Sequence, residues 1–486
     1  MFKQAQKALQ SANSQIVALA ALAVLLRVYH LGFQSLWFDE VTTLMFSSGD
    51  NLKELLARIA TDVHPPLYYL SIHFWLQLFP ATESGLRAFS AATSLASLGC
   101  FYLVAGALLS PQSRTVASLI AVTSLYQIWF AQEARSYGLI SLLTLLYVLS
   151  YLEFITQPKF KSALVHSLLA ALLLYTNYVR VFLFLPFAIH ALVVWRQSAS
   201  LQRPILFYGV ISLVMALLLY LPWLVQAHAS YNQVASNYWI GRPTLGDLFR
   251  LAPILLNYTG AFPELKAFAK VFAFCFFSLL ALQSRFPVFA LPMPVVNQVA
   301  NKNDLPKRPV PAPKLLLYLW LIVPPLATYF VSLYGSHIFY FKPLIISSFA
   351  LYLLLGDLIT RLPRVNFQMA LLALIIAFSG ANYNWYYNAF HKEEWRNVTA
   401  YIEPKSAPVD QFIFDEPAGK LPFDHYYKQQ YRSLTLGDLP QAERVWVIRS
   451  LSNKPLTQYK IQLREQGYRL RGAKPFAGVV VMLFNK

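Results

Sequence analysis

Charged residues are scarce in this 486-residue chain. They make up 13% of it, whereas hydrophobic residues make up 57%. The apolar residues are gathered in long runs, such as 86–109 and 315–333, and are not spread at helix or strand periods. Each of these runs approaches or exceeds the roughly 20 residues that cross the hydrocarbon core of a bilayer. This composition excludes a soluble globular protein and predicts an α-helical polytopic membrane protein.

Cysteine is nearly absent, and acidic residues are few. Cys100 and Cys275 are the two cysteines, and both fall inside apolar runs, which excludes a disulfide framework and a cysteine-based metal site. The chain has 22 acidic and 40 basic residues. The basic residues are dispersed among short loops, without an aromatic-interleaved basic domain, so we expect no nucleic-acid partner. No small-residue cleavage site follows the first apolar run, which is therefore expected to be a retained helix and not a signal peptide.

Hydropathy predicts about eleven membrane spans. With the N-terminus in the cytoplasm, the cytoplasmic loops hold most lysines and arginines, as the positive-inside rule requires. An odd number of spans places everything after Tyr383 on the outer face of the plasma (inner) membrane. The segment 284–314, rich in Pro, Asn and Lys, is then a cytoplasmic linker within a membrane domain that covers 1–382. The predicted spans are 14–32, 85–109, 115–131, 137–155, 163–176, 179–195, 204–223, 264–282, 315–334, 339–356 and 366–382.

The residues from 383 to 486 have a different character. They contain charges, turns and short alternating apolar runs, together with a helical pattern near 456–466. These features predict a small extracytoplasmic α/β domain, with strands near 411–414, 444–448 and 478–483.

The first outer loop, about 33–84, contains two predicted helices. Leucine and isoleucine recur at helical spacing in 52–59, behind Asp50 as the N-cap, which predicts an amphipathic helix in the membrane interface. The apolar stretch 65–79 is short for a span, so we expect a re-entrant or juxtamembrane helix there.

Four groups of ionisable residues lie at predicted outer membrane boundaries. Asp39 and Glu40 follow the first span, and Arg87 opens the second. Asp62-Val-His64-Pro-Pro lies between them, and Glu133-Ala-Arg135 ends the third span. A solvated helix end would explain the acidic pair, and a structural ion pair would explain the others, although ionisable residues at this depth are functional candidates by default. Residues at i and i+2 do not face each other on a helix, so Glu133 and Arg135 have separate roles or form a turn.

Taken together, these motifs resemble the GT-C superfamily of membrane glycosyltransferases. The similarity covers about the first 200 residues and is greatest to protein O-mannosyltransferases and lipid A aminoarabinose transferases. The resemblance implies a GT-C fold, a polyprenyl-phosphate sugar donor and Asp39 as the catalytic base, with Glu40 beside it. It also places Arg87 near the lipid phosphate.

The chain departs from both relatives at several positions. Tyr68 and Tyr69 stand where the mannosyltransferases have Gly-Lys, and His64 stands where the aminoarabinose transferases have Lys. Lys342-Pro343 replaces a common Arg-Tyr at the start of a late span. The sugar and the acceptor, whether a lipid, a glycan or a protein hydroxyl, therefore stay open.

The reaction requires a base for the acceptor hydroxyl and positive charge for the departing phosphate. Arginine suits the second task because its planar fork binds phosphate through two hydrogen bonds. The predicted catalytic residues are Asp39 and Glu40. A single displacement predicts inversion at the anomeric carbon. The predicted donor and phosphate site consists of His64, Arg87, Glu133, Arg135 and Lys342.

A divalent cation is an alternative source of charge. Asp39, Glu40, His64 and His337 offer oxygen and nitrogen ligands, but their spacing forms no local ligand motif, so no metal site is assigned.

Two other classes of function were weighed against an enzyme. A lipid or sugar transporter would usually show internal repeats or interrupted helices in matching halves, and neither is found. A non-catalytic assembly protein for envelope polysaccharide would not need the acidic residues. In the C-terminal domain, we expect 392–396 to be a solvated connection and the acids of 414–419 to form a turn after a strand.

Overall fold

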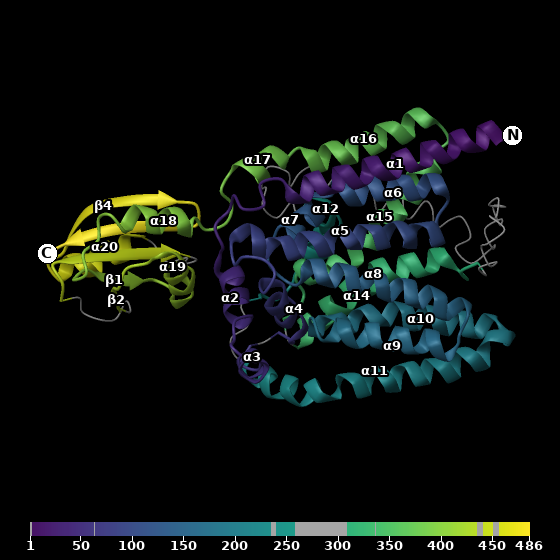
Figure 1. Cartoon of the computed structure of the whole chain (residues 1–486), viewed down its shortest axis with the longest axis horizontal. Coiled ribbons are helices and arrows are strands. Elements are labelled where there is room, and N and C mark those ends of the chain that lie inside the picture. Colours follow the sequence, from purple (N-terminus) through teal and green to yellow (C-terminus); the bar gives the residue numbers. More distant parts are fainter. Residues whose placement is uncertain are drawn as a thin grey trace. The chain divides into compact units, whose positions relative to one another are not determined.

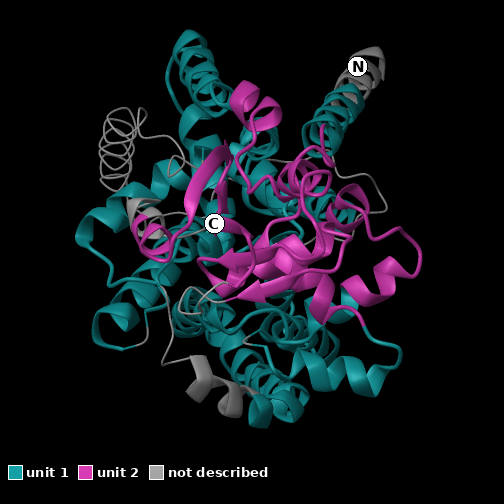
Figure 2. Ribbon diagram, turned by 90° about the vertical axis from the view of Figure 1, so that its left-hand side faces the viewer, with its two compact units in different colours: residues 1–29, 49–71, 88–382 teal, residues 30–48, 72–87, 383–486 magenta. Residues whose placement is uncertain are grey.

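The computed structural model of the chain describes residues 2–62, 64–234, 240–257, 309–335, 337–434, 441–450 and 456–486. The predicted span at 264–282 lies outside these residues, as does most of the predicted linker at 284–314. The chain divides into two compact units, coloured separately in Figure 2. The first, the helical unit, comprises Met1–Tyr29, Gly49–Ser71 and Ala88–Asn382. The second, the sheet unit, comprises His30–Ser48, Ile72–Arg87 and Tyr383–Lys486.

Long apolar helices make up most of the helical unit, and their axes run roughly parallel in Figure 1. Among the described residues, seven helical segments are long and apolar enough to cross a membrane, and two shorter apolar ones lie at 13–28 and 160–174. This agrees with the predicted polytopic fold. The seven segments are Glu83–Leu108, Tyr137–Thr156, Tyr178–Gln197, Ala199–Gln226, Pro313–Tyr334, Lys342–Thr360 and Val365–Asn388. The helices are α1 (Phe2–Val28), α5 (Glu83–Leu108), α6 (Pro111–Thr123), α7 (Leu125–Ala131), α8 (Tyr137–Thr156), α9 (Phe160–Leu174), η1 (Tyr178–Arg180), α10 (Val181–Gln197), α11 (Ala199–Val234), α12 (Leu245–Asn257), α14 (Pro313–Tyr334), η4 (Lys342–Leu344), α15 (Ile345–Thr360) and α16 (Val365–Gly380).

The predicted continuous span at 115–131 is wrong, because the chain forms two helices there. Ser124 leaves the helical conformation with ψ 118°, and its hydroxyl accepts a hydrogen bond from the backbone N–H of Gln127, which caps α7. The same hydroxyl lies 2.9 Å from both the Leu256 carbonyl and the Tyr352 hydroxyl. A buried serine with these partners stabilises the break, which hydropathy does not reveal.

Helix α15 is the buried centre of the helical unit, with every residue from 345 to 359 buried. It packs against α6, α8 and α14. A side chain at Gly356 would meet the Ala117 Cβ at 2.6 Å, so a small residue at this position allows α6 and α15 to approach closely. By contrast, α11 has long runs of exposed leucine and valine, as expected for a lipid-facing helix.

The first outer loop forms the short helices α3 (Leu52–Ile59) and α4 (Leu67–Leu76). Helix α3 confirms that this segment is helical, with Leu55 and Ile59 buried and Lys53 and Glu54 exposed, and its place in the membrane interface stays a prediction. Its N-cap is Asn51 and not Asp50: the Asn51 side chain accepts the Glu54 N–H at 2.9 Å. At ten residues, α4 is too short to cross a bilayer.

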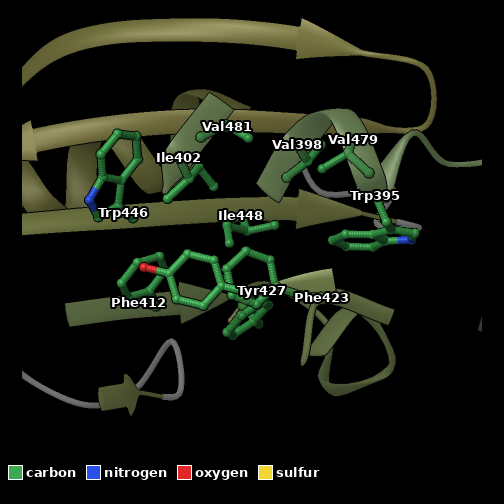
Figure 3. Packing of buried hydrophobic residues seen from close by; sticks show 11 residues of the cluster. Trp395, Val398, Ile402, Phe412, Phe423, Tyr427, Trp446, Ile448, Val479 and Val481 are labelled. Carbon is green, nitrogen blue, oxygen red and sulfur yellow. The ribbon is translucent and has the colours of Figure 1, made fainter. Parts of the chain in front are cut away.

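The sheet unit contains the predicted α/β domain. Its five strands lie in the order β2-β1-β3-β5-β4, where β1 pairs in parallel with β2 and β3, and β5 pairs antiparallel with β3 and β4. Aromatic side chains, among them Trp395, Phe412, Phe423 and Trp446, pack into a core on one face (Figure 3). A second cluster, with Leu463 of α20, covers the other face. The elements are α2 (Phe38–Phe46), α17 (Tyr383–Asn388), α18 (Trp395–Ile402), β1 (Gln411–Phe414), η5 (Pro417–Gly419), α19 (Lys420–Tyr426), β2 (Arg432–Leu434), β3 (Arg444–Ser450), α20 (Leu456–Glu465), β4 (Arg469–Phe476) and β5 (Val479–Asn485).

Candidate active site

Asp39 and Glu40 lie in the first turn of α2, in the sheet unit. Acidic side chains are favourable there because the positive end of the helix dipole and unpaired N–H groups face them. The two residues have different surroundings. Asp39 is half-buried, whereas Glu40 is 0% exposed.

The Glu40 carboxylate is held by two cations. Arg87 donates from Nε to Oε1 at 2.8 Å and from Nη2 to Oε2 at 2.7 Å, which is the bidentate geometry of a strong ion pair. Lys392 donates from Nζ to Oε1 at 2.9 Å. All three side chains are at most 8% exposed. Glu40 is therefore committed to a buried ion cluster.

Arg87 uses all five of its N–H donors within the sheet unit. Besides the bonds to Glu40, Nη1 donates to the carbonyls of Leu31 and Gln34 at 3.0 and 2.8 Å, and Nη2 donates to that of Ser35 at 2.9 Å. This geometry favours a positioning role for Arg87, because the guanidinium fixes the loop that leads into α2. The expected contact with a lipid phosphate stays a prediction, and this arrangement leaves no donor for it.

The segment 392–396 is not the solvated connection that the sequence suggests. Lys392 and Trp395 are almost fully buried, and Arg396 donates to the Glu83 carboxylate at 3.0 Å and to the Phe33 carbonyl at 2.8 Å. Its two basic residues, Lys392 and Arg396, are paired with Glu40 and Glu83 of the segment 33–84, which is far away in the sequence. Charge density alone predicted solvent exposure, and these long-range partners are the reason that the prediction is wrong.

A further carboxyl group belongs to the surroundings of Asp39. Glu393 is 8% exposed, and its Oε2 has no hydrogen-bond partner among the described residues. Burial raises the pKa of Glu393, and the charges of Asp39 and Glu40 act in the same direction. Sequence reasoning missed this residue because its burial depends on tertiary packing.

His64 and Arg135 meet in the helical unit. The Tyr69 hydroxyl donates to Asp62 Oδ2 at 2.6 Å, and His64 Nδ1 lies 3.1 Å from the same oxygen. Arg135 Nη2 lies 3.4 Å from His64 Nε2. The His64 imidazole therefore lies between the Asp62 carboxylate and the Arg135 guanidinium.

Glu133 and Lys342 form a second pair in the helical unit. Lys342 Nζ lies 3.5 Å from Glu133 Oε1, and the Trp129 indole donates to Oε2 at 3.2 Å. Residues 132–136 connect α7 to α8 as a turn, so Glu133 and Arg135 have separate partners. The turn was one of the two alternatives that the sequence left open.

The structure thus groups the predicted residues in two places. Asp39, Glu40 and Arg87 lie together in the sheet unit, while His64, Glu133, Arg135 and Lys342 lie in the helical unit. No group of three or more His, Cys, Asp or Glu side chains that could hold a metal occurs among the described residues. His337 lies 3.1 Å from the Ile240 carbonyl through Nδ1.

Several solved structures resemble this chain. ArnT from Cupriavidus metallidurans, bound to undecaprenyl phosphate, is 12% identical over 96% of this chain and 97% of its own, with a TM-score of 0.57. The apo state of the same ArnT is 14% identical over 97% and 98%, with a TM-score of 0.49. The oligosaccharyltransferase AglB from Archaeoglobus fulgidus is 10% identical over 86% of this chain and 63% of its own, with a TM-score of 0.44.

No protein-family model matches the chain, and no curated protein sequence does. The structural likeness to ArnT extends over nearly the whole length of both chains, including the small sheet domain. The apolar helices agree with it. The chain is an integral membrane protein with the fold of the GT-C membrane glycosyltransferases.

Proposed function

We propose that the protein is an inverting glycosyltransferase, which moves a sugar from a polyprenyl-phosphate donor to an acceptor hydroxyl on the extracytoplasmic face. The observation that carries the proposal is the full-length likeness to an ArnT that binds undecaprenyl phosphate. The acceptor is a lipid, glycan or protein hydroxyl.

In this proposal Asp39 is the general base. The acceptor hydroxyl gives its proton to the Asp39 carboxylate while its oxygen attacks the anomeric carbon. The bond from that carbon to the phosphate oxygen breaks, and the polyprenyl phosphate leaves with the electron pair. A single displacement inverts the configuration of the sugar, and one well-placed base contributes about 10²–10⁴-fold.

The ion cluster supports Asp39 as the base over Glu40. Both Glu40 oxygens accept hydrogen bonds from buried cations, so protonating Glu40 would leave Arg87 and Lys392 without a counter-charge. Asp39 is half-buried and adjacent to this fixed point. The cluster therefore holds the start of α2 and leaves Asp39 as the proposed base.

We propose that cations of the helical unit bind the phosphate of the donor. Arg135 and Lys342 are its candidates, with His64 and Glu133 as their neighbours. Positive charge held in place before the reaction stabilises the leaving phosphate without reorganisation.

The test is an in vitro transfer assay on purified protein in nanodiscs. The labelled donors are undecaprenyl-phosphate mannose and undecaprenyl-phosphate aminoarabinose, and the readout is label in a new glycosidic product from added membrane extract. Asp39→Asn should lower transfer by at least about 10²-fold, while donor binding stays near that of the wild type. Asp50→Asn, an exposed acid of the same loop, is the control and should be active.

Three outcomes of this assay count against the proposal. If the wild-type protein forms no product with either donor, it does not transfer these two sugars. Movement of the labelled lipid across the bilayer without a new product would favour the transporter. An Asp39→Asn protein as active as the control would remove Asp39 as the base.

A further inference from the structure

Arg27, Arg87 and Arg180 have fully buried side chains, but they differ in how their donors are used. Arg87 pairs with Glu40 and with backbone carbonyls. Arg27 donates to Ser94 Oγ at 3.1 Å and to the carbonyls of Ala23, Ala121 and Val122 at 3.2–3.5 Å. A buried arginine of this chain is therefore normally surrounded by acceptors, as the cost of burying an unpaired cation requires.

Arg180 is the exception. Its Nη1 donates to the Pro343 carbonyl at 2.7 Å, whereas Nε and Nη2 have no hydrogen-bond partner in the part of the chain that the structure describes. These two donors lie on one edge of the guanidinium. Arg87 uses the corresponding edge of its own guanidinium to bind the two carboxylate oxygens of Glu40. At Arg180 the same bidentate edge is buried and unused.

The surroundings of Arg180 are electropositive. It precedes α10, and its partner Pro343 lies in η4, which leads directly into α15. Helix N-termini carry partial positive charge, and the hydrogen bond from Arg180 to Pro343 links the starts of α10 and α15. Among the described residues, no carboxylate pairs with the Arg180 guanidinium. Lys342, next to Pro343, is already paired with Glu133.

We infer that the unused edge of Arg180 binds a phosphate monoester, namely that of the polyprenyl donor, an assignment that rests on the proposed function. A phosphate offers two oxygens at the spacing that this edge requires, and its negative charge balances the fully buried guanidinium of Arg180, two of whose donors have no partner among the described residues. The starts of α10 and α15, which the bond from Arg180 to Pro343 links, add partial positive charge beside the same anion. Because Arg180 is fully buried, the phosphate enters as the groups that cover this edge move aside.

The experiment measures binding of undecaprenyl phosphate, without a sugar, to purified protein in nanodiscs. Arg180→Met should weaken affinity by about 10- to 150-fold, the loss expected for hydrogen bonds to a charged group. Arg180→Lys should recover only part of it, because a lysine is a point charge without the fork. Arg27→Met is the matched control: it also removes a fully buried arginine, but it should bind undecaprenyl phosphate as the wild type does.

Thermal unfolding of the same proteins without ligand separates binding from a structural role. Removing a buried cation with unsatisfied donors relieves a cost, so Arg180→Met should unfold at the wild-type temperature or above it. Arg27→Met should unfold at a lower temperature, because it loses satisfied hydrogen bonds. Undecaprenyl phosphate should raise the unfolding temperature of wild type and of Arg27→Met, and that of Arg180→Met much less.

Wild-type affinity in Arg180→Met would overturn the inference, as would a wild type that does not bind undecaprenyl phosphate. Should Arg180→Met not fold, wild-type affinity in Arg180→Lys would overturn it equally. Phosphatidic acid and inorganic phosphate are the comparison ligands. If Arg180→Met weakened their binding as much as that of undecaprenyl phosphate, the site would be a general phosphate site and the assignment to the donor would be wrong. Arg180-dependent binding by a protein without transferase activity would refute the proposed function and leave this inference standing.

Discussion

Glu40→Gln is the substitution that most directly tests the buried ion cluster of the sheet unit. The cluster contains one carboxylate and two cations, Arg87 and Lys392, and so has a net charge of +1. Glutamine is nearly the same size as glutamate but is neutral, so the cluster becomes +2 in a site that is almost without solvent. If the glutamine amide nitrogen takes the place of Oε1, the acceptor of two hydrogen bonds, from Arg87 and Lys392, is lost as well.

The expected loss of stability follows from these contacts. Breaking a buried ion pair by removing one partner costs about 3–5 kcal/mol, because the remaining charge is uncompensated. Lys392→Met should cost less, about 1–2 kcal/mol, because it removes one hydrogen bond and leaves the Arg87–Glu40 pair balanced. Glu40→Gln should therefore destabilise the protein more than Lys392→Met does. The double variant should lose less than the sum of the two, with a coupling of about 0.5–3 kcal/mol.

The assay is thermal unfolding of detergent-solubilised protein, followed by tryptophan fluorescence. For a domain of this size about 1 kcal/mol corresponds to roughly 2–4 °C, so Glu40→Gln should unfold about 6–20 °C below the wild type. Glu54→Gln is the control. This substitution breaks an exposed ion pair between Glu54 and Arg58, in which the Glu54 side chain is 47% exposed. It should change the free energy of unfolding by less than about 0.5 kcal/mol.

Two results would refute this reasoning. If Glu40→Gln unfolded at the temperature of the control, the buried cluster would not stabilise the sheet unit. If it kept its stability and lost transfer activity while Asp39→Asn remained active, Glu40 would be the base and the roles of the two acids would have to be exchanged.

Two further predictions concern pH and topology. Burial holds the pKa of His391 at about 3, with the charge of Lys392 acting in the same direction, so the folded state keeps this imidazole neutral while the unfolded chain binds a proton below about pH 6.5. Stability should therefore fall as the pH drops from about 6.5 towards 3. His391→Gln should reduce the loss of stability between pH 7.5 and pH 5 by about 2 kcal/mol, measured from the unfolding temperatures at both pH values. Equal losses in the wild type and the variant would contradict this prediction. A reporter fused after Asn384 should behave as extracytoplasmic and one fused within 300–310 as cytoplasmic, because of the loop charge bias. The opposite pattern would invert the topology.

The sequence by itself determined the features that depend on neighbouring residues. Hydropathy is a sum over about 20 consecutive positions, so the long helices such as α5 and α8 were predicted closely. Strands β1 and β3 were predicted from short apolar runs between turns. The position of the N-cap of α3 was missed by one residue, because Asp50 and Asn51 are both good caps and the helix start decides between them. The likeness to GT-C enzymes rested on motifs that are also local.

The tertiary structure decided what each charge does. Glu40 and Arg87 looked alike as candidates for chemistry, but the Glu40 carboxylate binds both Arg87 and Lys392, and Lys392 lies more than 300 residues away in the sequence. The sequence did not single out Arg180, and only the placement of its neighbours shows that two of its donors are buried without a partner among the described residues. The sequence gives the charge of a side chain, but the free energy of a charge in a protein depends on burial and on the distance to opposite charges, and both are set by residues far apart in the chain.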